Sequence, residues 1–394
     1  MMASEKTQNL WTPAFSLLCV VQFLGYAQHF VLQPTLPLYV THFGGSPFIV
    51  GVVMAAFSST SLVFRPLVGY WSDRWSEVGI MISGLAIQAA SGIVCFLPFI
   101  ATTALANSFR GVGWASFNSG GYALLAQAAP AERRGEASGY YTGVQNSATI
   151  LLPALALWLI DAPFGGYRAV FALSVALALC GAAISFAIER RTVISERTRA
   201  AARTGPWWRE ILRLPEKDIV LASALLFGLH VSLPAMASFL VLYARQIGIE
   251  NFGWYYVASG ATSLIARPLL GWASDKIGRG AAVATGFTLE ALALCLIVTA
   301  SSLGAMMLSG VLYMLGSAIG AAATLALALE RASPERRGQA VATYSMAYPL
   351  GAGIGSLLTG AAIQLVGYYW MFLFVAALNI PGMIVVYKNR ASLQ

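Results

Sequence analysis

The chain has 394 residues, of which 58% are hydrophobic and only 10% are charged, and its formal net charge is +8. Soluble domains usually contain about 25% charged residues, so this chain cannot cover a water-exposed surface. The composition excludes a soluble enzyme, a disordered protein and a nucleic-acid-binding protein, and it indicates a chain that lies mostly in a lipid bilayer.

Twelve apolar segments are long enough to cross a bilayer as helices, because a helix needs about 20 mostly apolar residues to span the hydrocarbon. A polar segment divides them six and six, and the eleventh and twelfth are separated only around Gly367. In chain order the predicted spans are 13–40, 47–71, 78–98, 103–128, 136–160, 167–188, 218–243, 252–273, 280–300, 304–329, 339–365 and 368–388.

The polar segment 189–217 carries eight basic residues, with apolar side chains between them at helical spacing. This pattern is typical of a short amphipathic helix on the membrane surface. We therefore expect an N-terminal six-helix bundle over 1–188, a basic cytoplasmic linker with an interfacial helix over 189–217, and a C-terminal six-helix bundle over 218–394.

The basic residues predict the orientation. If the N-terminus is cytoplasmic, 19 of the 24 Lys and Arg residues lie in cytoplasmic segments, and only Arg168 and Arg245 lie on the opposite side. Cytoplasmic loops carry such an excess of basic residues, so we expect a multi-pass protein of the bacterial inner membrane with both termini in the cytoplasm. Orientation and contact with anionic lipid explain the positive charge without a nucleic-acid partner.

No group of residues in the spans predicts catalysis or metal binding. The four cysteines lie singly in apolar runs and form no Cys-x-x-Cys pair, which is typical of small packing residues. The three histidines are scattered, and the spans contain neither a nucleophile motif nor paired carboxylates. We expect no enzymatic activity, no catalytic residue, no metal site and no cofactor.

The chain contains an internal repeat. The stretch Arg65-Pro-Leu-Val-Gly-Tyr-Trp-Ser-Asp73-Arg74 recurs 202 residues later as Arg267-Pro-Leu-Leu-Gly-Trp-Ala-Ser-Asp275-Lys276. A second block, Glu132-Arg-Arg-Gly, recurs 203 residues later at 335–338. With six spans in each copy, the halves are expected to be parallel repeats around an axis along the membrane normal.

Over essentially its whole length the chain resembles the major facilitator superfamily. The stretch Gly69-Tyr-Trp-Ser-Asp73-Arg74 is similar to the Gly-x-x-x-Asp-Arg loop of that family between spans 2 and 3, and its copy lies between spans 8 and 9. The preceding Arg-Pro pair is similar to bacterial members described as sugar- or drug-efflux permeases. The resemblance implies an all-α membrane protein of twelve transmembrane helices in two parallel six-helix repeats.

The duplicated loops predict a cytoplasmic gate between the halves. The loop glycines allow close helix approach, and the loop aspartates can accept hydrogen bonds from arginines and helix N-termini of the other half. The alternative is that these charges only anchor the topology. The predicted gating residues are Gly69, Asp73, Arg74, Arg133, Arg134, Gly271, Asp275, Lys276, Arg336 and Arg337.

Polar stripes predict the transport pathway, which the resemblance places between spans 1, 4, 7 and 10, with 2, 5, 8 and 11 at the sides. Four polar residues of span 1 share one helical face, and span 4 has a similar row. Such faces should avoid lipid. The alternative for each residue is packing. The predicted substrate-binding residues are Gln22, Tyr26, His29, Gln33, Arg110, Trp114, Asn118, Tyr141, Gln145, His230, Tyr344 and Tyr348.

The charges in this lining favour an anionic, zwitterionic or hydroxyl-rich solute, because no acid is among the cavity-facing candidates on spans 1, 4, 5 or 7. Histidine titrates near neutral pH, so His29 is the first candidate for proton coupling, followed by His230 and Glu290. Two departures from the pattern of proton-coupled exporters weaken this inference. In span 4, Asn107 stands where those exporters often have Arg, and span 5 lacks their glycine series.

We expect a monomeric secondary active transporter that exports a small polar organic solute against protons by alternating access of its two halves. Its partners would be the solute, protons and membrane lipids. The alternatives are an uncoupled facilitator, a proton-coupled importer, a multidrug exporter, or a channel, against which the duplicated gating loops argue.

Overall fold

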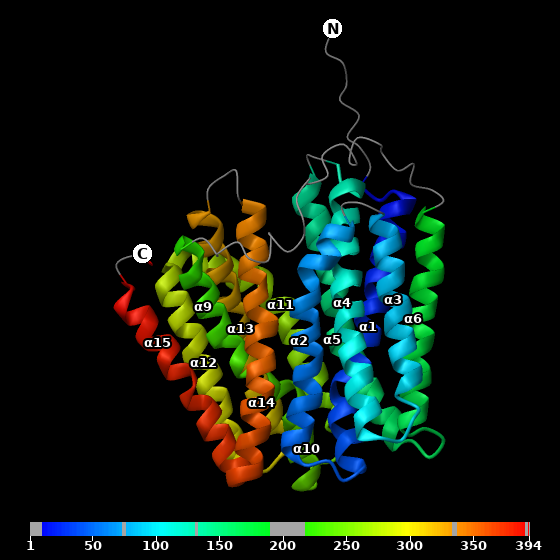
Figure 1. Cartoon of the computed structure of the whole chain (residues 1–394). Helices are drawn as coiled ribbons and strands as arrows, with labels where there is room; N and C mark the ends of the chain where they lie inside the picture. Colours follow the sequence, from blue (N-terminus) through cyan, green and yellow to red (C-terminus); the bar gives the residue numbers. More distant parts are fainter. Residues whose placement is uncertain are drawn as a thin grey trace.

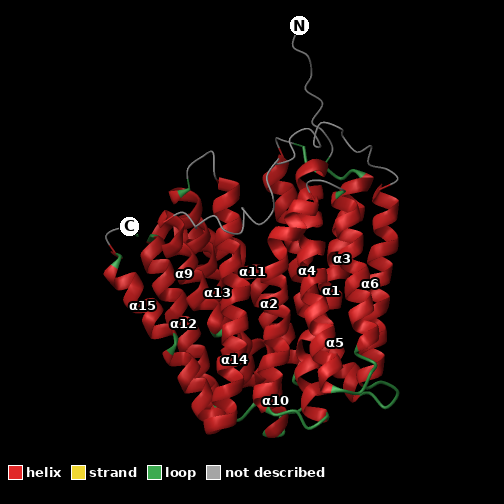
Figure 2. Cartoon of the chain, viewed as in Figure 1, coloured by secondary structure: helices red, strands yellow, loops and turns green. Residues whose placement is uncertain are grey.

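The computed structural model describes residues 10–72, 76–130, 133–189, 217–332, 337–390 and 393. In these ranges the chain is helical and forms no strand, and the helices stand side by side in one bundle (Figure 1). Figure 2 shows that the loops lie at the two ends of the bundle. The predicted linker helix lies outside the described residues.

The N-terminal half contains six helices, each corresponding to one predicted span. Thr12 caps the first helix by accepting a hydrogen bond from the Phe15 amide at 3.2 Å, and Ser76 caps the third in the same way through Gly79 at 3.1 Å. The helices are α1 (Pro13–His42), α2 (Pro47–Ser72), α3 (Glu77–Val94), α4 (Ile100–Ala128), α5 (Arg134–Asp161) and α6 (Tyr167–Glu189).

The C-terminal half forms the other six spans. Its first span is broken into α9 (Lys217–Val231), the π-helix η2 (Ala235–Phe239) and α10 (Leu240–Gln246), because Ser232 leaves the helix and Pro234 lacks a backbone donor. The others are α11 (Gly253–Ile277), α12 (Arg279–Thr299), α13 (Leu303–Arg331), α14 (Arg337–Ala377) and α15 (Asn379–Lys388).

The last two spans are separated within α14. Gly367 has φ 79° and ψ 175°, a conformation that interrupts the helix and that glycine adopts without steric cost. The predicted division at this residue is therefore confirmed. By length and composition, nine described helical segments can cross a membrane, and the longest, Thr343–Lys388, contains both last spans. The more polar α4 and α11 complete the twelve.

The two halves repeat the same helix pairings. In the first half α4 packs on α2 and α3, and α1 packs on α5; in the second, α13 packs on α11 and α12, and α9 packs on α14. The halves meet where α2 lies beside α14 and α5 beside α11 (Figure 1). The predicted fold class, two parallel six-helix repeats, is confirmed.

The bundle has two ends, which we name by the chain segments they carry. The terminal face, at the top of Figure 1, carries the start of α1, the end of α6, the start of α9 and the end of α15. The far face carries the loops between α1 and α2, between α5 and α6, and between α10 and α11.

Candidate functional site

Among the described residues, the hydrophobic core that the two halves share lies toward the far face. There, Leu38, Val50 and Leu157 of the first half are buried together with Met236 and Phe239 of the second. Toward the terminal face, separate clusters form within each half. The first contains residues between Leu10 and Ile188, and the second contains residues between Ile219 and Leu393. The packing therefore closes the far face.

Backbone contacts between α2 and α14 are part of this closure. A Cβ atom built on Gly51 would lie 2.5 Å from the Ser356 carbonyl oxygen, and one on Gly360 would lie 2.6 Å from the Pro47 carbonyl oxygen. The helices can approach this closely only because both positions lack a side chain.

Polar and aromatic pairs also join the halves at the far face. Arg245 at the end of α10 donates to both carboxylate oxygens of Asp161 at the end of α5, at 2.7 and 2.9 Å. Ser46 donates to Gln364 at 3.0 Å. The rings of Trp158 and Trp254 meet edge to face, 5.7 Å between centroids.

The ion pair between Asp161 and Arg245 is expected to stabilise the closed far face only weakly. The two side chains are 56% and 41% exposed, and such pairs contribute about 0–1 kcal/mol. Asp161→Asn should therefore shift the conformational equilibrium by less than about tenfold. We would measure this equilibrium through the rate at which maleimide labels Ala154→Cys, a buried position of α5 near the far face. The labelled protein would be in detergent and would lack the native cysteines. The exchanged pair Asp161→Arg/Arg245→Asp should restore the slow rate. An acceleration of more than about tenfold in Asp161→Asn would contradict the weak contribution assigned to this pair.

Among the described residues, the terminal face is open at the two loop glycines that were predicted to lie in the gate. No described atom beyond the chain neighbours and the local helix backbone lies within 4 Å of a Cβ built on Gly69 or Gly271. Leu269 and Trp272 on α11 are exposed. Arg65, further inside, still spans the halves by donating to the carbonyl and hydroxyl oxygens of Ser345 at 3.1 Å.

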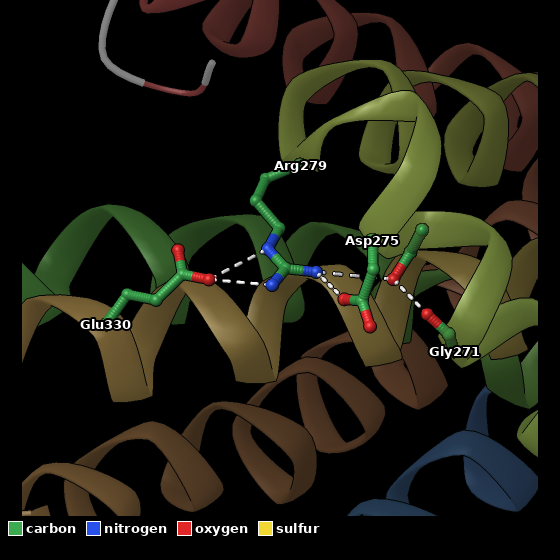
Figure 3. Close-up of polar contacts among 5 residues, drawn as sticks. Gly271, Asp275, Arg279 and Glu330 are labelled. Atoms are coloured by element: carbon green, nitrogen blue, oxygen red, sulfur yellow. Dashed lines mark hydrogen bonds and ion pairs between the residues drawn. The ribbon is translucent and has the colours of Figure 1, made fainter.

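In this conformation two of the predicted gating residues, Asp275 and Arg133, form ion pairs within their own half. Figure 3 shows Arg279 between Asp275 and Glu330: it forms an ion pair with Asp275, and it donates to Glu330 at 2.7 Å. In the first half Arg133 forms an ion pair with Glu136 at 2.8 Å.

The remaining predicted gating residues are placed as follows. The ammonium of Lys276 lies 3.9 Å from the ring centroid of Trp272, and Arg134 is exposed at the start of α5. Arg337 begins α14. Asp73, Arg74 and Arg336 lie outside the described residues.

A buried cationic cluster joins α1 and α4. Arg110 is 2% exposed, and its guanidinium donates to Asn107 and, over 3.2 Å, to the Nδ1 atom of His29. His29 stacks on Trp114 with 4.2 Å between ring centroids, and the Arg110 guanidinium lies 4.8 Å from the ring centroid of Phe57 on α2. Predicted residues of two separate polar stripes thus meet at one point.

Nothing in the described surroundings neutralises Arg110. Every acid between residues 10 and 189 lies at a helix end or in a loop, and α1, α2 and α4 contain none. The Nε atom of Arg110 is buried and makes no hydrogen bond. An unpaired buried charge is costly, so the geometry suits an anionic group from outside the protein.

Apart from Gln33, the other polar residues of the stripe and the residues that bond to them lie toward the terminal face. Tyr26 donates to Asn118 at 3.0 Å, and Gln145 donates to Gln22 at 3.1 Å. Tyr141 is fully buried against Gly121. Gln33, one turn beyond His29, is half-buried.

The predicted tyrosines of α14 point in different directions. Tyr348 is exposed, and its ring lies 4.5 Å from that of the buried His230, whose Nδ1 atom is 2.9 Å from the Leu226 carbonyl. Tyr344 is buried and bonds with Thr324 at 2.9 Å, which ties α14 to α13. Tyr344 therefore packs within the second half.

Glu290 lies apart from the cationic cluster, inside the second half. Its side chain is 0% exposed, and its Oε2 atom is 2.9 Å from the hydroxyl of Ser232. The same hydroxyl is 2.8 Å from the phenol oxygen of Tyr313 on α13. Of the predicted proton-coupling residues, only His29 touches the cationic cluster.

Comparison with known proteins now fixes the family. The model of the Major Facilitator Superfamily matches residues 18–251 and again residues 222–392. The chain belongs to the Major Facilitator Superfamily. Like the other members it is a transporter and not an enzyme.

Relatives of this superfamily protein include exporters. It is 22% identical to the staphylopine export protein of Staphylococcus aureus over 387 residues, covering 95% of this chain and 96% of the relative. Two solved structures share the fold. The human organic anion transporter MFSD10 has a TM-score of 0.67 at 16% identity, covering 95% of this chain and 100% of that one. A bacterial homologue of the lysosomal transporter Spinster, in an inward-facing and unoccupied conformation, has a TM-score of 0.78 at 13% identity, covering 96% and 97%.

Several residues at these sites escaped the analysis of the sequence. Phe57 is an ordinary apolar residue of its span, and Ser232 is one of many span serines, so neither carried a signal. Asp161 and Arg245 did carry one, because each is a charged residue on the side that has few. Asn107 was noted only as a departure from the family pattern.

Proposed function

We propose that this transporter exports a small zwitterionic carboxylate across the bacterial inner membrane, in exchange for protons, by alternating access. One observation carries the solute class: among the described residues, no carboxylate lies beside the buried guanidinium of Arg110, which is flanked by His29, Trp114 and Phe57. A guanidinium binds a carboxylate through paired hydrogen bonds, and the aromatic rings give the solute an apolar wall.

The direction rests on three supports. The basic residues assign the terminal face to the cytoplasm. The open terminal face would then be the state that loads solute from the cytoplasm. One relative that matches this chain over nearly its whole length is named an export protein.

Exchange for protons favours a zwitterion over a simple anion. The Nδ1 atom of His29 faces an Arg110 donor, so the imidazole is neutral there. A second proton on His29 would remove that acceptor and add a positive charge beside Arg110. This charge would attract the carboxylate of a solute but repel its ammonium group. Protonation of His29 therefore opposes the binding of a solute that also carries a cationic group, and it does not oppose the binding of a simple anion.

Ligand-induced thermal stabilisation tests the solute class. Purified protein would be heated with amino acids and their N-carboxyalkyl derivatives, with simple di- and tricarboxylates, and with the lipophilic cation tetraphenylphosphonium. A bound ligand raises the melting temperature through mass action. We expect the aminocarboxylates to stabilise the protein most. Stabilisation by the lipophilic cation alone would instead support a multidrug exporter.

His29→Gln is expected to separate binding from coupling. Glutamine can still accept the Arg110 hydrogen bond through its amide oxygen, but it cannot take up a proton. Solute exchange between the two sides of proteoliposomes should persist, while accumulation driven by a pH gradient should be lost. Unchanged gradient-driven accumulation in His29→Gln would show that His29 is not the proton carrier. If the unaltered protein also failed to accumulate solute in a pH gradient, the protein would be a facilitator.

A further inference from the structure

The break in the seventh span coincides with a buried carboxyl group. Ser232, the residue between α9 and the π-helix, places its hydroxyl within hydrogen-bond distance of three oxygens: the Leu229 carbonyl at 3.1 Å, Glu290 at 2.9 Å and Tyr313 at 2.8 Å. Leu229 belongs to the last turn of α9, where backbone carbonyls lack helical donors. The conformation of this span is therefore linked to Glu290 through one hydroxyl group.

Counting protons shows which state of Glu290 fits these contacts. A serine hydroxyl donates one hydrogen bond and accepts two, and a carbonyl only accepts. If Glu290 is ionised, its Oε2 atom and the Leu229 carbonyl both require the single Ser232 proton. If Glu290 is protonated, it donates to Ser232, Tyr313 donates to Ser232, and Ser232 donates to Leu229. Only the protonated carboxyl satisfies all three contacts.

The environment provides no other way to stabilise a charge on Glu290. Its Oε1 atom is buried without a hydrogen-bond partner. The titratable groups that face the network are Tyr313 from α13, with Tyr255 of α11 and Tyr348 of α14 in electrostatic reach of its phenol. The described surroundings thus supply hydroxyl groups and no cation. Tyr348 is exposed, and its ring contacts that of His230.

We infer that Glu290 is a second proton-binding site. When Glu290 releases its proton, the Ser232 hydroxyl donates to the carboxylate and no longer to the Leu229 carbonyl, and this change of partner alters the bend of the seventh span. The inference rests on the proposed proton-coupled transport and locates one of its coupling sites outside the cationic cluster. The protonated form belongs to the conformation with the closed far face. Loss of the proton favours opening of that face, which is the order that exchange of protons for an exported solute requires.

Two measurements on the full-length protein in lipid nanodiscs test this inference without a transported solute. Infrared spectroscopy detects the carbonyl band of a protonated carboxyl group, and spin labels at Phe164→Cys and Leu365→Cys report the far-face distance across the halves. Both positions are exposed on the far side. As the pH rises, we expect the band to be lost and the labelled distance to lengthen together, as a one-proton titration.

Variants separate the steps. Glu290→Gln, which can donate to Ser232 but carries no titratable proton, should lack the band and keep the short distance at every pH. Ser232→Ala should keep the band but lose the pH dependence of the distance. Tyr313→Phe, a milder change that leaves the core packed, should shift the midpoint of both curves. A band and a distance profile in Glu290→Gln equal to those of the unaltered protein would overturn the inference.

The controls distinguish this inference from the proposed function. His29→Gln should retain both pH-dependent signals, because it lies in the other half. Loss of the distance change in His29→Gln with an unaltered Glu290 band would assign the switch to His29. Failure of the aminocarboxylates to stabilise the protein would overturn the solute class and leave the Glu290 result unaffected.

Discussion

Arg110→Gln is expected to weaken the binding of carboxylate solutes strongly without destabilising the protein. A hydrogen bond to a charged group contributes about 1.5–3 kcal/mol, so affinity should fall roughly ten- to hundredfold. Meanwhile the substitution removes a buried cation that has no counter-charge, and glutamine can still donate to Asn107. The melting temperature without ligand should therefore stay the same or rise, while the shift produced by an aminocarboxylate should disappear.

Two further variants make this result specific. Arg110→Lys keeps the charge but loses the paired donors, so we expect intermediate affinity. Gln28→Met removes a buried hydrogen bond to Ser174 between α1 and α6 and does not touch the cluster, so affinity should be unchanged. If Arg110→Gln lowered the melting temperature while retaining the ligand shift, Arg110 would be a structural residue and the proposed solute site would be wrong.

Gly51→Val is expected to hold the far face open. Its Cβ atom would collide with the Ser356 backbone of α14, which cannot move aside as a flexible side chain could. Overpacking costs about 1–3 kcal/mol, which corresponds to roughly a 5–150-fold shift in a conformational equilibrium. Labelling of Ala154→Cys should accelerate by a factor in that range, and transport should be lost.

Gly69→Val provides the matched test at the other end. No described neighbour would meet a Cβ on Gly69 in this conformation, so the variant should fold and keep the slow labelling of Ala154→Cys. If the duplicated loops close the terminal face during transport, this variant should nevertheless stop transport. Gly304→Val, at an open position near the start of α13, should leave both readouts unchanged. Full transport by Gly69→Val would remove the loop glycines from the gate.

The fold followed from the sequence because hydrophobic length and the positions of Gly and Pro determine where spans begin and end. The division of the last two spans at Gly367, which no charged residue marks, also corresponds to a change in backbone conformation. The pairing of α2 with α14 and of α5 with α11 had no such signal, because contacts between distant helices leave no periodic pattern. Gly51 and Gly360 become informative only once their helices are known to touch.

The site was predicted in part. Helical spacing placed His29 and Arg110 on the inner faces of their spans, and the structure brings them together. Spacing could not orient α14, however, since Tyr344 and Tyr348 lie one turn apart, yet one packs against α13 and the other is exposed. Nor could it reveal that Glu290 bonds to the break in the seventh span, because that contact depends on local loss of helix at Ser232.

The most direct test of alternating access measures both ends of the molecule in the same preparation. The distance between spin labels at Tyr140→Cys and Leu269→Cys reports the terminal face, and the distance between labels at Phe164→Cys and Leu365→Cys reports the far face. In each pair one label lies on α5 or the loop after it, and the other lies in the second half. When pH or ligand changes the populations, the terminal distance should shorten in the same fraction of molecules in which the far distance lengthens. Distances that change at both ends in the same direction, or at one end only, would contradict this account.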